Sequence, residues 1–306
     1  MIYTLTPNPA LDYNVYPEGF ELGKINRAKK GKIFCGGKGI NVSSVLNTLK
    51  VENVSLGFVA GFTGKELERR LELNGIKTDF ITLSSGITRI NVKIRTHSET
   101  DINLSGAVPT KKEIDSLFAK ISENLKQGDI LCLCGNVQSE LGDDFYERLA
   151  KVAAKNKAKI AVDATKNQLL NTLKYNPVLI KPNLEELCEI AEKPLKTDGE
   201  IIAFAKHLCD LGAENTLVTL GDKGAIAVNK EKEAFKVTAP EITPKNTVGA
   251  GDSAFAGFLA EYQKGDFKRA IAISVACGTA TAKSEGLCKA EQIEKILKEV
   301  TVQKIG

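Results

Sequence analysis

One short segment of the sequence joins a carboxylate to small residues at the start of a predicted helix. The run Thr247-Val-Gly-Ala-Gly-Asp252 precedes an apolar helical stretch, and Gly249, Ala250 and Gly251 can expose their backbone N–H groups there. N–H groups at a helix N-terminus bind anions, such as the charge that spreads over a phosphoryl group during transfer. Asp252 can then act as a general base toward an attacking hydroxyl. The alternative is an ordinary glycine turn, with Asp252 as a first-turn residue of the helix.

A second glycine-rich segment carries a lysine. In Cys35-Gly-Gly-Lys-Gly-Ile-Asn-Val-Ser43, glycines flank Lys38, so the backbone can approach a ligand closely. The helix predicted from Asn41 onward again offers an N-terminus. The segment is not a Walker A loop, because Gly39 follows the lysine where that loop has Ser or Thr. Phosphate binding and a plain helix start both remain open for this segment.

Two further motifs follow predicted strands, where α/β proteins bind their ligands. In Lys181-Pro-Asn-Leu-Glu-Glu186, Asn183 and Glu186 are three residues apart and share a helix face. Their oxygens suit a Mg²⁺ ion held partly through water, but the same pair also fits a capping box. The run Leu220-Gly-Asp-Lys-Gly224 can bring glycine backbone near a nucleotide, or it can be a simple hairpin turn.

The elements that must position these motifs alternate along the chain. Short apolar runs bounded by Gly, Asp or Asn predict buried parallel strands at 54–60, 129–134, 159–163, 178–181 and 216–220. Helical spacing predicts helices at 111–126, 143–155, 184–191 and 200–211, then three consecutive helices at 250–262, 267–284 and 290–300. This rhythm favours one α/β domain over residues 1–306, with helices on both faces of a mostly parallel sheet.

Two segments break the rhythm. Residues 11–32 and 86–104 contain alternating β-prone residues with no helix between the strands. Alternation predicts strands with one buried face and one wet face. We expect the two segments to pair as a small sheet that forms a lid over one edge of the core. Two unrelated surface hairpins are the alternative.

The composition excludes several classes of protein. Hydrophobic residues make up 42% and charged residues 26%, which argues against a disordered chain. No apolar run reaches the ~18 residues that cross a bilayer. Because no signal peptide is evident either, we expect a cytoplasmic protein without a membrane partner. The net charge of +4 is spread along the chain and argues against a nucleic-acid partner. Seven cysteines without a C-x-x-C pair predict free thiols, and two histidines make a His-based metal centre or a Ser-His-Asp triad improbable.

Together, these motifs resemble those of the PfkB (ribokinase-like) carbohydrate kinases over nearly the whole chain. The resemblance rests on Thr6-Pro-Asn-Pro-Ala-Leu-Asp12, Gly36-Gly-Lys-Gly-Ile-Asn-Val-Ser43, Asn183-x-x-Glu186, Leu220-Gly-Asp-Lys-Gly224 and Gly249-Ala-Gly-Asp252, in that order. It implies a three-layer α/β/α core with a β lid that often forms a homodimer interface. It also implies an ATP-dependent kinase that uses Mg²⁺. A monovalent cation would bind backbone carbonyls, which leave no trace in the sequence.

The resemblance implies roles for individual residues. Asp252 would be the catalytic base, and the anion hole would be formed by Gly249, Ala250 and Gly251. Asn183 and Glu186 would organise Mg²⁺ and the phosphates through water. The nucleotide site would be lined by Asn183, Thr219, Gly221, Gly224 and Gly251. The sugar hydroxyls would be held by Asp12, Gly37 and Asn41.

Within that family, the chain most resembles the kinases of phosphorylated ketohexoses, namely 1-phosphofructokinases and tagatose-6-phosphate kinases. The segment Thr88-Arg-Ile-Asn-Val-Lys93 is similar to one found in 1-phosphofructokinases. Arg89, Asn91 and Lys93 would project from one face of a strand, and Arg and Lys are apt phosphate ligands. The substrate phosphate would be clamped by Arg89, Lys93, Lys38 and Arg27. A solvated strand face is the alternative.

The resemblance therefore implies phosphoryl transfer from ATP to a ketohexose monophosphate. D-fructose 1-phosphate, giving fructose 1,6-bisphosphate, is the first choice. Tagatose 6-phosphate is the alternative, because one clamp can serve either sugar if the sugar binds turned around. A non-catalytic sugar-phosphate sensor is an alternative from another class, although Asp252 and its glycines are intact. A free-sugar or nucleoside kinase is disfavoured, since several desolvated cations facing an uncharged sugar would be costly.

Overall fold

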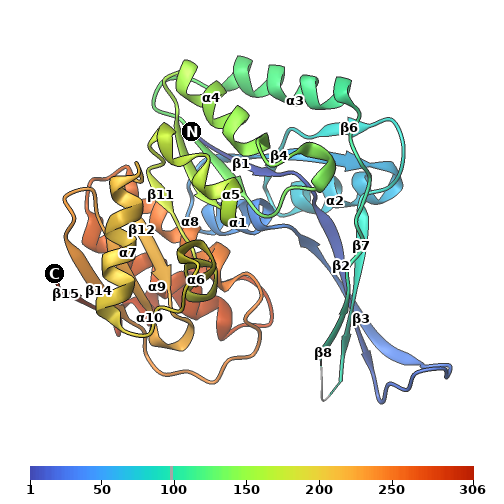
Figure 1. Ribbon diagram of the computed structural model, residues 1–306. Helices are drawn as coiled ribbons and strands as arrows, with labels where there is room; N and C mark the ends of the chain where they lie inside the picture. The colour runs from blue at the N-terminus through green and yellow to red at the C-terminus, as the bar shows by residue number, and fades with distance from the viewer. Residues whose placement is uncertain (97–98) are drawn as a thin grey trace.

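A mostly parallel sheet lies at the centre of the computed structural model, which describes residues 1–96 and 99–306 (Figure 1). The strand order is β15-β14-β13-β12-β11-β10-β9-β1-β4-β5, and β6 also pairs with β4. The pairings are parallel except at one edge, where β12 through β15 are antiparallel. The strands are β1 (Ile2–Thr6), β4 (Asn53–Ala60), β5 (Lys77–Thr78), β6 (Ile81–Leu83), β9 (Ile130–Cys134), β10 (Lys159–Asp163), β11 (Leu179–Ile180), β12 (Thr216–Thr219), β13 (Ala225–Val228), β14 (Ala234–Thr238) and β15 (Thr301–Lys304).

Helices cover both faces of this sheet (Figure 1). The α-helices are α1 (Lys38–Thr48), α2 (Gly61–Leu73), α3 (Lys111–Asn124), α4 (Phe145–Lys155), α5 (Lys166–Leu170), α6 (Leu184–Ala191), α7 (Asp198–Asp210), α8 (Ala250–Tyr262), α9 (Phe267–Ala282) and α10 (Ala290–Leu297). Short 3₁₀ turns are η1 (Ser139–Leu141), η2 (Leu173–Tyr175) and η3 (Gly221–Lys223).

The side chains of β9 show how the two helical layers divide. Leu131 and Leu133 belong to the core cluster that contains residues of α3, α4 and α7. Ile130, Cys132 and Cys134 belong to the cluster that contains residues of α1, α8 and α9. A strand buried on both faces must be apolar at successive positions, which is why this segment is a continuous apolar run in the sequence. The three-layer α/β fold expected from the sequence is therefore confirmed.

A second, smaller sheet projects from the large one at the lower right of Figure 1. Its strands, in the order β3-β2-β7-β8, are β3 (Ala28–Gly36), β2 (Ala10–Pro17), β7 (Arg89–Arg95) and β8 (Glu99–Ile102). The two predicted segments pair directly, because β2 and β7 are parallel neighbours, so the alternative of unrelated hairpins is wrong. Residues 97–98 of the second segment lie outside the described residues.

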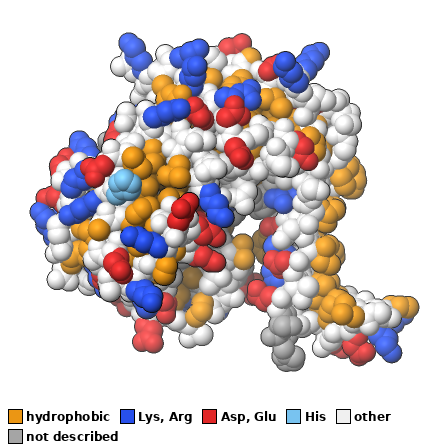
Figure 2. Space-filling view, viewed as in Figure 1, with side chains coloured by type: hydrophobic (Ala, Val, Ile, Leu, Met, Phe, Trp, Pro, Cys, Tyr) orange, Lys and Arg blue, Asp and Glu red, His pale blue; other side chains and the backbone are white. Residues whose placement is uncertain are grey.

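The two faces of the small sheet differ in polarity. Asp12 lies opposite Asn91 in the register of β2 and β7, so polar side chains share one face. On the other face Tyr13 lies opposite Ile33, while Ile102 belongs to the β8 edge. These three side chains are 38–52% exposed, and Figure 2 shows hydrophobic side chains along this projection. This is the amphipathic pattern that alternation predicts, although the apolar face is not covered within the described chain.

The end of the chain differs from the sequence-based expectation. The sequence predicts one helix over residues 290–300, whereas α10 ends at Leu297 and β15 pairs antiparallel with β14 at the sheet edge. The strand Thr301–Lys304 contains one apolar residue, so no alternation marks it, and pairing with β14 decides its conformation. Within residues 1–96 and 99–306, no helix combines the length and apolarity required to span a bilayer.

We expect Gly57→Ala to destabilise the join between β1 and β4. Gly57 has a φ of 149° and lies opposite Thr6, whose carbonyl oxygen would be 2.0 Å from an added Cβ. Because both strands are held in the sheet, relieving the contact should cost about 2–4 kcal/mol of unfolding free energy. Urea denaturation followed by circular dichroism measures the loss. Gly19→Ala is the matched control, since nothing lies within 4 Å of its added Cβ. Equal denaturation midpoints for the two variants would contradict this expectation.

Candidate active site

A cavity of about 950 Å³ lies among the strand ends of the large sheet, the small sheet and the start of α8. Parallel strands bring the residues that follow them to one edge of a sheet, which gathers distant motifs here. The residues predicted for the site that line this cavity are Asp12, Gly37, Lys38, Asn41, Arg89, Asn91, Asn183, Glu186, Thr219, Gly221, Gly224, Gly249, Ala250, Gly251 and Asp252. Arg27 and Lys93 do not line it.

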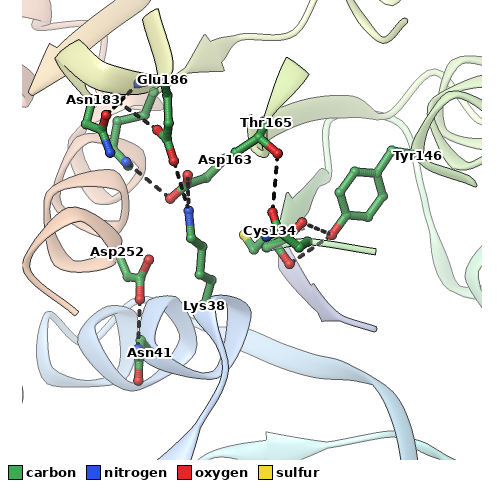
Figure 3. A network of polar contacts seen from close by, with 12 residues as sticks. Lys38, Asn41, Cys134, Tyr146, Asp163, Thr165, Asn183, Glu186 and Asp252 are labelled. Carbon is green, nitrogen blue, oxygen red and sulfur yellow. Dashed lines mark hydrogen bonds and ion pairs between the residues drawn. The ribbon is translucent and has the colours of Figure 1, made fainter. Parts of the chain in front are cut away.

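Asp252 lies in the first turn of α8 and is only 7% exposed. The Asn41 side chain, from α1, donates a 2.7 Å hydrogen bond from Nδ2 to Oδ2 of Asp252 (Figure 3). Burial raises the pKa of Asp252 to about 6, the negative charge of Asp163 adds to the rise, and Lys38 opposes it. The carboxylate is therefore ionised at neutral pH and more basic than an exposed aspartate.

The small residues before Asp252 form the turn that begins α8. Gly249 is the N-cap, and Ser253 donates a 2.7 Å hydrogen bond from Oγ to the Gly249 carbonyl. The Ala250 N–H donates to the Thr247 carbonyl at 3.2 Å, so this N–H already has a partner. The N–H groups of a first helical turn otherwise lack partners within the helix, and together with the helix dipole they attract anions.

A buried ion cluster lies beside the cavity (Figure 3). Asp163, at the end of β10, has no solvent exposure; its Oδ1 is 3.0 Å from Lys38 Nζ and its Oδ2 is 3.3 Å from Lys181 Nζ. Glu186 Oε1 lies 3.8 Å from Lys38 Nζ. Burial works against the charge on Lys38, but Asp163, Asp252 and Glu186 together raise the pKa of Lys38 above its ordinary value. Burial likewise opposes ionisation of Asp163, yet Lys181 and Lys38 lower its pKa.

Asn183 and Glu186 form a capping box at the start of α6. Asn183 Oδ1 accepts from the Glu186 N–H at 2.8 Å, and Glu186 Oε2 accepts from the Asn183 N–H at 2.9 Å. The capping interpretation is therefore confirmed, but it uses only one carboxylate oxygen of Glu186. The other oxygen is the one near Lys38. Within residues 1–96 and 99–306 no cluster of three or more His, Cys, Asp or Glu side chains could hold a metal ion. A metal here would need water and ligand oxygens to complete its shell.

The segment from Thr219 to Gly224 is a tight connection between β12 and the antiparallel β13. Leu220 N–H donates to the Gly224 carbonyl at 2.9 Å, which closes the turn around η3. Thr219 also forms an isolated parallel bridge with Asn183. The hairpin interpretation is therefore confirmed, and the same turn lines the cavity beside the α6 start.

The cations expected to clamp a phosphate do not converge on one point. Lys93 donates to Asp101 Oδ2 at 2.9 Å and lines a second hollow of about 460 Å³, which shares Asp12 and Asn41 with the cavity. Arg27 lies exposed in the loop before β3, and Lys38 is bound to Asp163. Of the four, Lys38 and Arg89 line the cavity. Asn91, on the same strand face, donates from Nδ2 to Asp12 Oδ1 at 2.8 Å.

A pocket of about 280 Å³, here called the Arg89 pocket, adjoins the cavity and shares Gly37, Lys38 and Arg89 with it. Arg89 donates from Nη2 to the Asn8 carbonyl at 2.9 Å and from Nη1 to the Leu104 carbonyl at 3.2 Å. Its Nε is buried and finds no hydrogen-bond partner among the described residues. The same holds for two other atoms of residues that line the pocket, Thr6 Oγ1 and Gln138 Oε1. The Arg89 guanidinium and the Lys38 ammonium also line this pocket, and such a lining suits an anionic ligand group.

Sequence reasoning missed four of the residues that shape the site. Asp163 and Lys181 end the predicted strands 159–163 and 178–181, and their position at strand ends is the signal that could have identified them. Thr6 stands in a recognised motif, but its unpartnered hydroxyl depends on tertiary packing. Gln138 follows β9 in a segment without any local pattern.

Comparison with known proteins extends this description. The sequence profile of the family described as "pfkB family carbohydrate kinase" matches residues 8–294. The 1-phosphofructokinase of Bacillus subtilis is 38% identical, covering all of both chains. The D-tagatose-1-phosphate kinase of Bacillus licheniformis is 34% identical over 99% of each chain, and a tagatose-6-phosphate kinase of Staphylococcus epidermidis is 27% identical over 99% of each.

A solved structure is similar over the same length. Phosphofructokinase-2 from Escherichia coli, in complex with potassium, matches with a TM-score of 0.91 at 25% identity, covering 97% of this chain and 98% of that one. These proteins are named as kinases, which gives the alternative of a non-catalytic sensor no support. Profile, full-length identity and fold agree with the site's carboxylate and glycine-rich turns: the chain belongs to the pfkB family of carbohydrate kinases.

Proposed function

We propose that this chain transfers the γ-phosphoryl group of ATP to D-fructose 1-phosphate and so forms fructose 1,6-bisphosphate. The observation that carries the proposal is that the cavity with Asp252 and the smaller pocket share Gly37, Lys38 and Arg89 as lining residues. A sugar whose hydroxyl meets the carboxylate can then direct its own phosphate toward the guanidinium. The relatives named 1-phosphofructokinase favour the fructose ester over other ketohexose phosphates.

In this proposal Asp252 is the general base. The accepting hydroxyl loses its proton to the Asp252 carboxylate as its oxygen attacks the γ-phosphorus and ADP leaves. A pKa of about 6 leaves the group ionised at neutral pH while making it a better proton acceptor than an exposed aspartate. Asn41 orients the carboxylate by binding Oδ2. The turn of Gly249, Ala250 and Gly251 would stabilise the charge on the transferred group through the N–H groups of Gly249 and Gly251, since the Ala250 N–H donates to the Thr247 carbonyl.

The nucleotide would lie against the strand ends opposite the small sheet. Thr219, Gly221 and Gly224 line the cavity there without bulky side chains. Asn183 and the Glu186 oxygen that the cap does not use, 3.8 Å from Lys38 Nζ, would hold Mg²⁺ through water, and the ion would neutralise charge on the phosphates. Because the Escherichia coli relative was solved with potassium, we extend the proposal to a monovalent cation bound by backbone carbonyls.

We further propose that residues 1–306 form a single kinase domain in which the small sheet is the lid. Asp12 and Asn91 face the cavity from it and would bind sugar hydroxyls, while Gly37 would contact the sugar from the start of α1. The exposed apolar face around Tyr13 and Ile33 would pair with a second copy of the chain. Arg27 and Lys93 do not line the cavity and have no part in this proposal.

We expect Asp252→Asn to lower kcat by about 10²–10⁴, because the hydroxyl loses its proton acceptor. Affinity for fructose 1-phosphate, measured by calorimetry without ATP, should be largely kept. The wild-type kcat should rise with pH through about 6 as Asp252 loses its proton, and that dependence should vanish in the variant.

The matched control for this variant is Asp115→Asn, an exposed aspartate on α3, whose kcat should stay within about twofold of wild type. Full activity of Asp252→Asn would refute the role of Asp252 as the base.

A substrate panel tests the choice of sugar. ADP release should be measured with fructose 1-phosphate, tagatose 1-phosphate, tagatose 6-phosphate, fructose 6-phosphate and free fructose. We expect kcat/KM for fructose 1-phosphate to exceed the others by about 10²-fold, or about 2.7 kcal/mol. A preference for either tagatose phosphate would keep the base and the Arg89 pocket but reject fructose 1-phosphate. Turnover of free fructose alone would reject the phosphate pocket.

A further inference from the structure

A buried tyrosine hydroxyl lies behind the wall of the Arg89 pocket. Tyr146, on α4, is fully buried, and its Oη is 2.8 Å from the Cys134 carbonyl oxygen and 2.9 Å from that of Gly135 (Figure 3). The two carbonyls belong to the last residue of β9 and the residue after it. The two carbonyls thus share the single proton of one phenol at the point where the strand becomes a loop.

The segment that this hydroxyl contacts is itself a wall of the pocket. Residues 134–138 line it together with Lys38 and Arg89, and they end at Gln138, which carries the unpartnered Oε1. Gly135 has a φ of 90°, and a Cβ there would lie 3.7 Å from the Lys38 side chain. The backbone conformation at Gly135 therefore determines how closely the wall approaches Lys38 and where the backbone of Gln138 lies.

Other contacts also hold this wall: Gln138 donates from Nε2 to the Ser105 carbonyl at 2.9 Å and to the Ala107 carbonyl at 3.3 Å. The Gly135 N–H donates to the Asp163 carbonyl at 2.9 Å, which fixes the strand end. Farther along, the Thr165 hydroxyl is 3.3 Å from Asn136 Oδ1, and the Val137 N–H is 3.4 Å from Gln168 Oε1. The Tyr146 hydroxyl is the contact that fixes both carbonyls, and burial raises the pKa of Tyr146, so it keeps the proton that it donates.

We propose that Tyr146 is a positioning residue for the substrate: its hydroxyl fixes the Cys134 and Gly135 carbonyls and thereby holds the wall of the Arg89 pocket in its binding geometry. The ring packs beside Phe145, with centroids 6.0 Å apart, and a phenylalanine would keep that packing. The positioning role follows from the contacts alone. Only the identity of the ligand in the pocket rests on the proposed function.

Tyr146→Phe tests the role without opening a cavity. Hydrogen–deuterium exchange by mass spectrometry on the protein without ligand should show about tenfold faster exchange for peptides that cover residues 135–138, because the two carbonyls lose the one hydroxyl donor that they share. Tyr262→Phe is the matched control. Tyr262 Oη also donates to a partly buried partner, Glu214 at 2.8 Å, but at the far end of α8. Its loss should leave exchange at 135–138 unchanged.

Kinetics test the consequence for binding. In Tyr146→Phe, KM for the sugar phosphate should rise about tenfold, while kcat and KM for ATP stay within about twofold. A general loss of stability would instead lower kcat or raise KM for both substrates. The control variant Tyr262→Phe would then show the same changes. Unchanged exchange at 135–138, or an equal change in both variants, would overturn the positioning role.

The two experiments also separate the positioning role from the proposed function. If wild-type protein turned over none of the sugar phosphates, the proposed function would fail, while the exchange result would still decide the role of Tyr146. If exchange rose at 135–138 but KM for the sugar phosphate did not, the wall would be positioned by Tyr146 without serving the substrate, which would overturn its role in binding.

Discussion

The buried carboxylate of Asp163 holds together the elements that form the cavity. Asp163 is the last residue of β10. It forms ion pairs with Lys38, the first residue of α1, and with Lys181, the residue that follows β11. A carboxylate without solvent is costly to bury unless it is paired, and here two ammonium groups face its two oxygens. Removing either lysine would leave excess negative charge in the interior. The two ion pairs therefore fix the end of β10, the start of α1 and the end of β11 relative to one another.

This ion cluster also sets the electrostatics of the neighbouring carboxylate. Asp252 lies near enough to Asp163 for that negative charge to add to the effect of burial on its pKa, while Lys38 and Lys181 act in the opposite direction. Without the lysines, two buried carboxylates would repel each other, and one would be held protonated at neutral pH. Without Asp163, the lysines would hold Asp252 as a weak base. The cluster therefore places the pKa of Asp252 between these two limits.

The sequence could predict those elements that leave a local pattern of apolar and polar residues. The apolar runs gave β9 and β10, helical spacing gave α6 and α8 to the residue, and alternation gave the small sheet. The face shared by Arg89 and Lys93 was also correct, but the partner of Lys93 was not predictable, because Asp101 meets it only through the register of β7 and β8. Tyr146 leaves no local pattern, and the sequence shows only that Asp163 ends a strand, because their partners come from other segments.

Two pairs of interpretations that compete in the sequence turn out to be compatible in space. Asn183 and Glu186 form a capping box, yet a carboxylate has two oxygens, and the one not used by the cap is near Lys38. The turn from Leu220 to Gly224 closes a hairpin, yet a hairpin at the carboxyl end of β12 also lines the cavity. A structural role therefore does not count against a binding role at a strand end, because the contacts that fix the backbone there leave other atoms of the same residues facing the cavity.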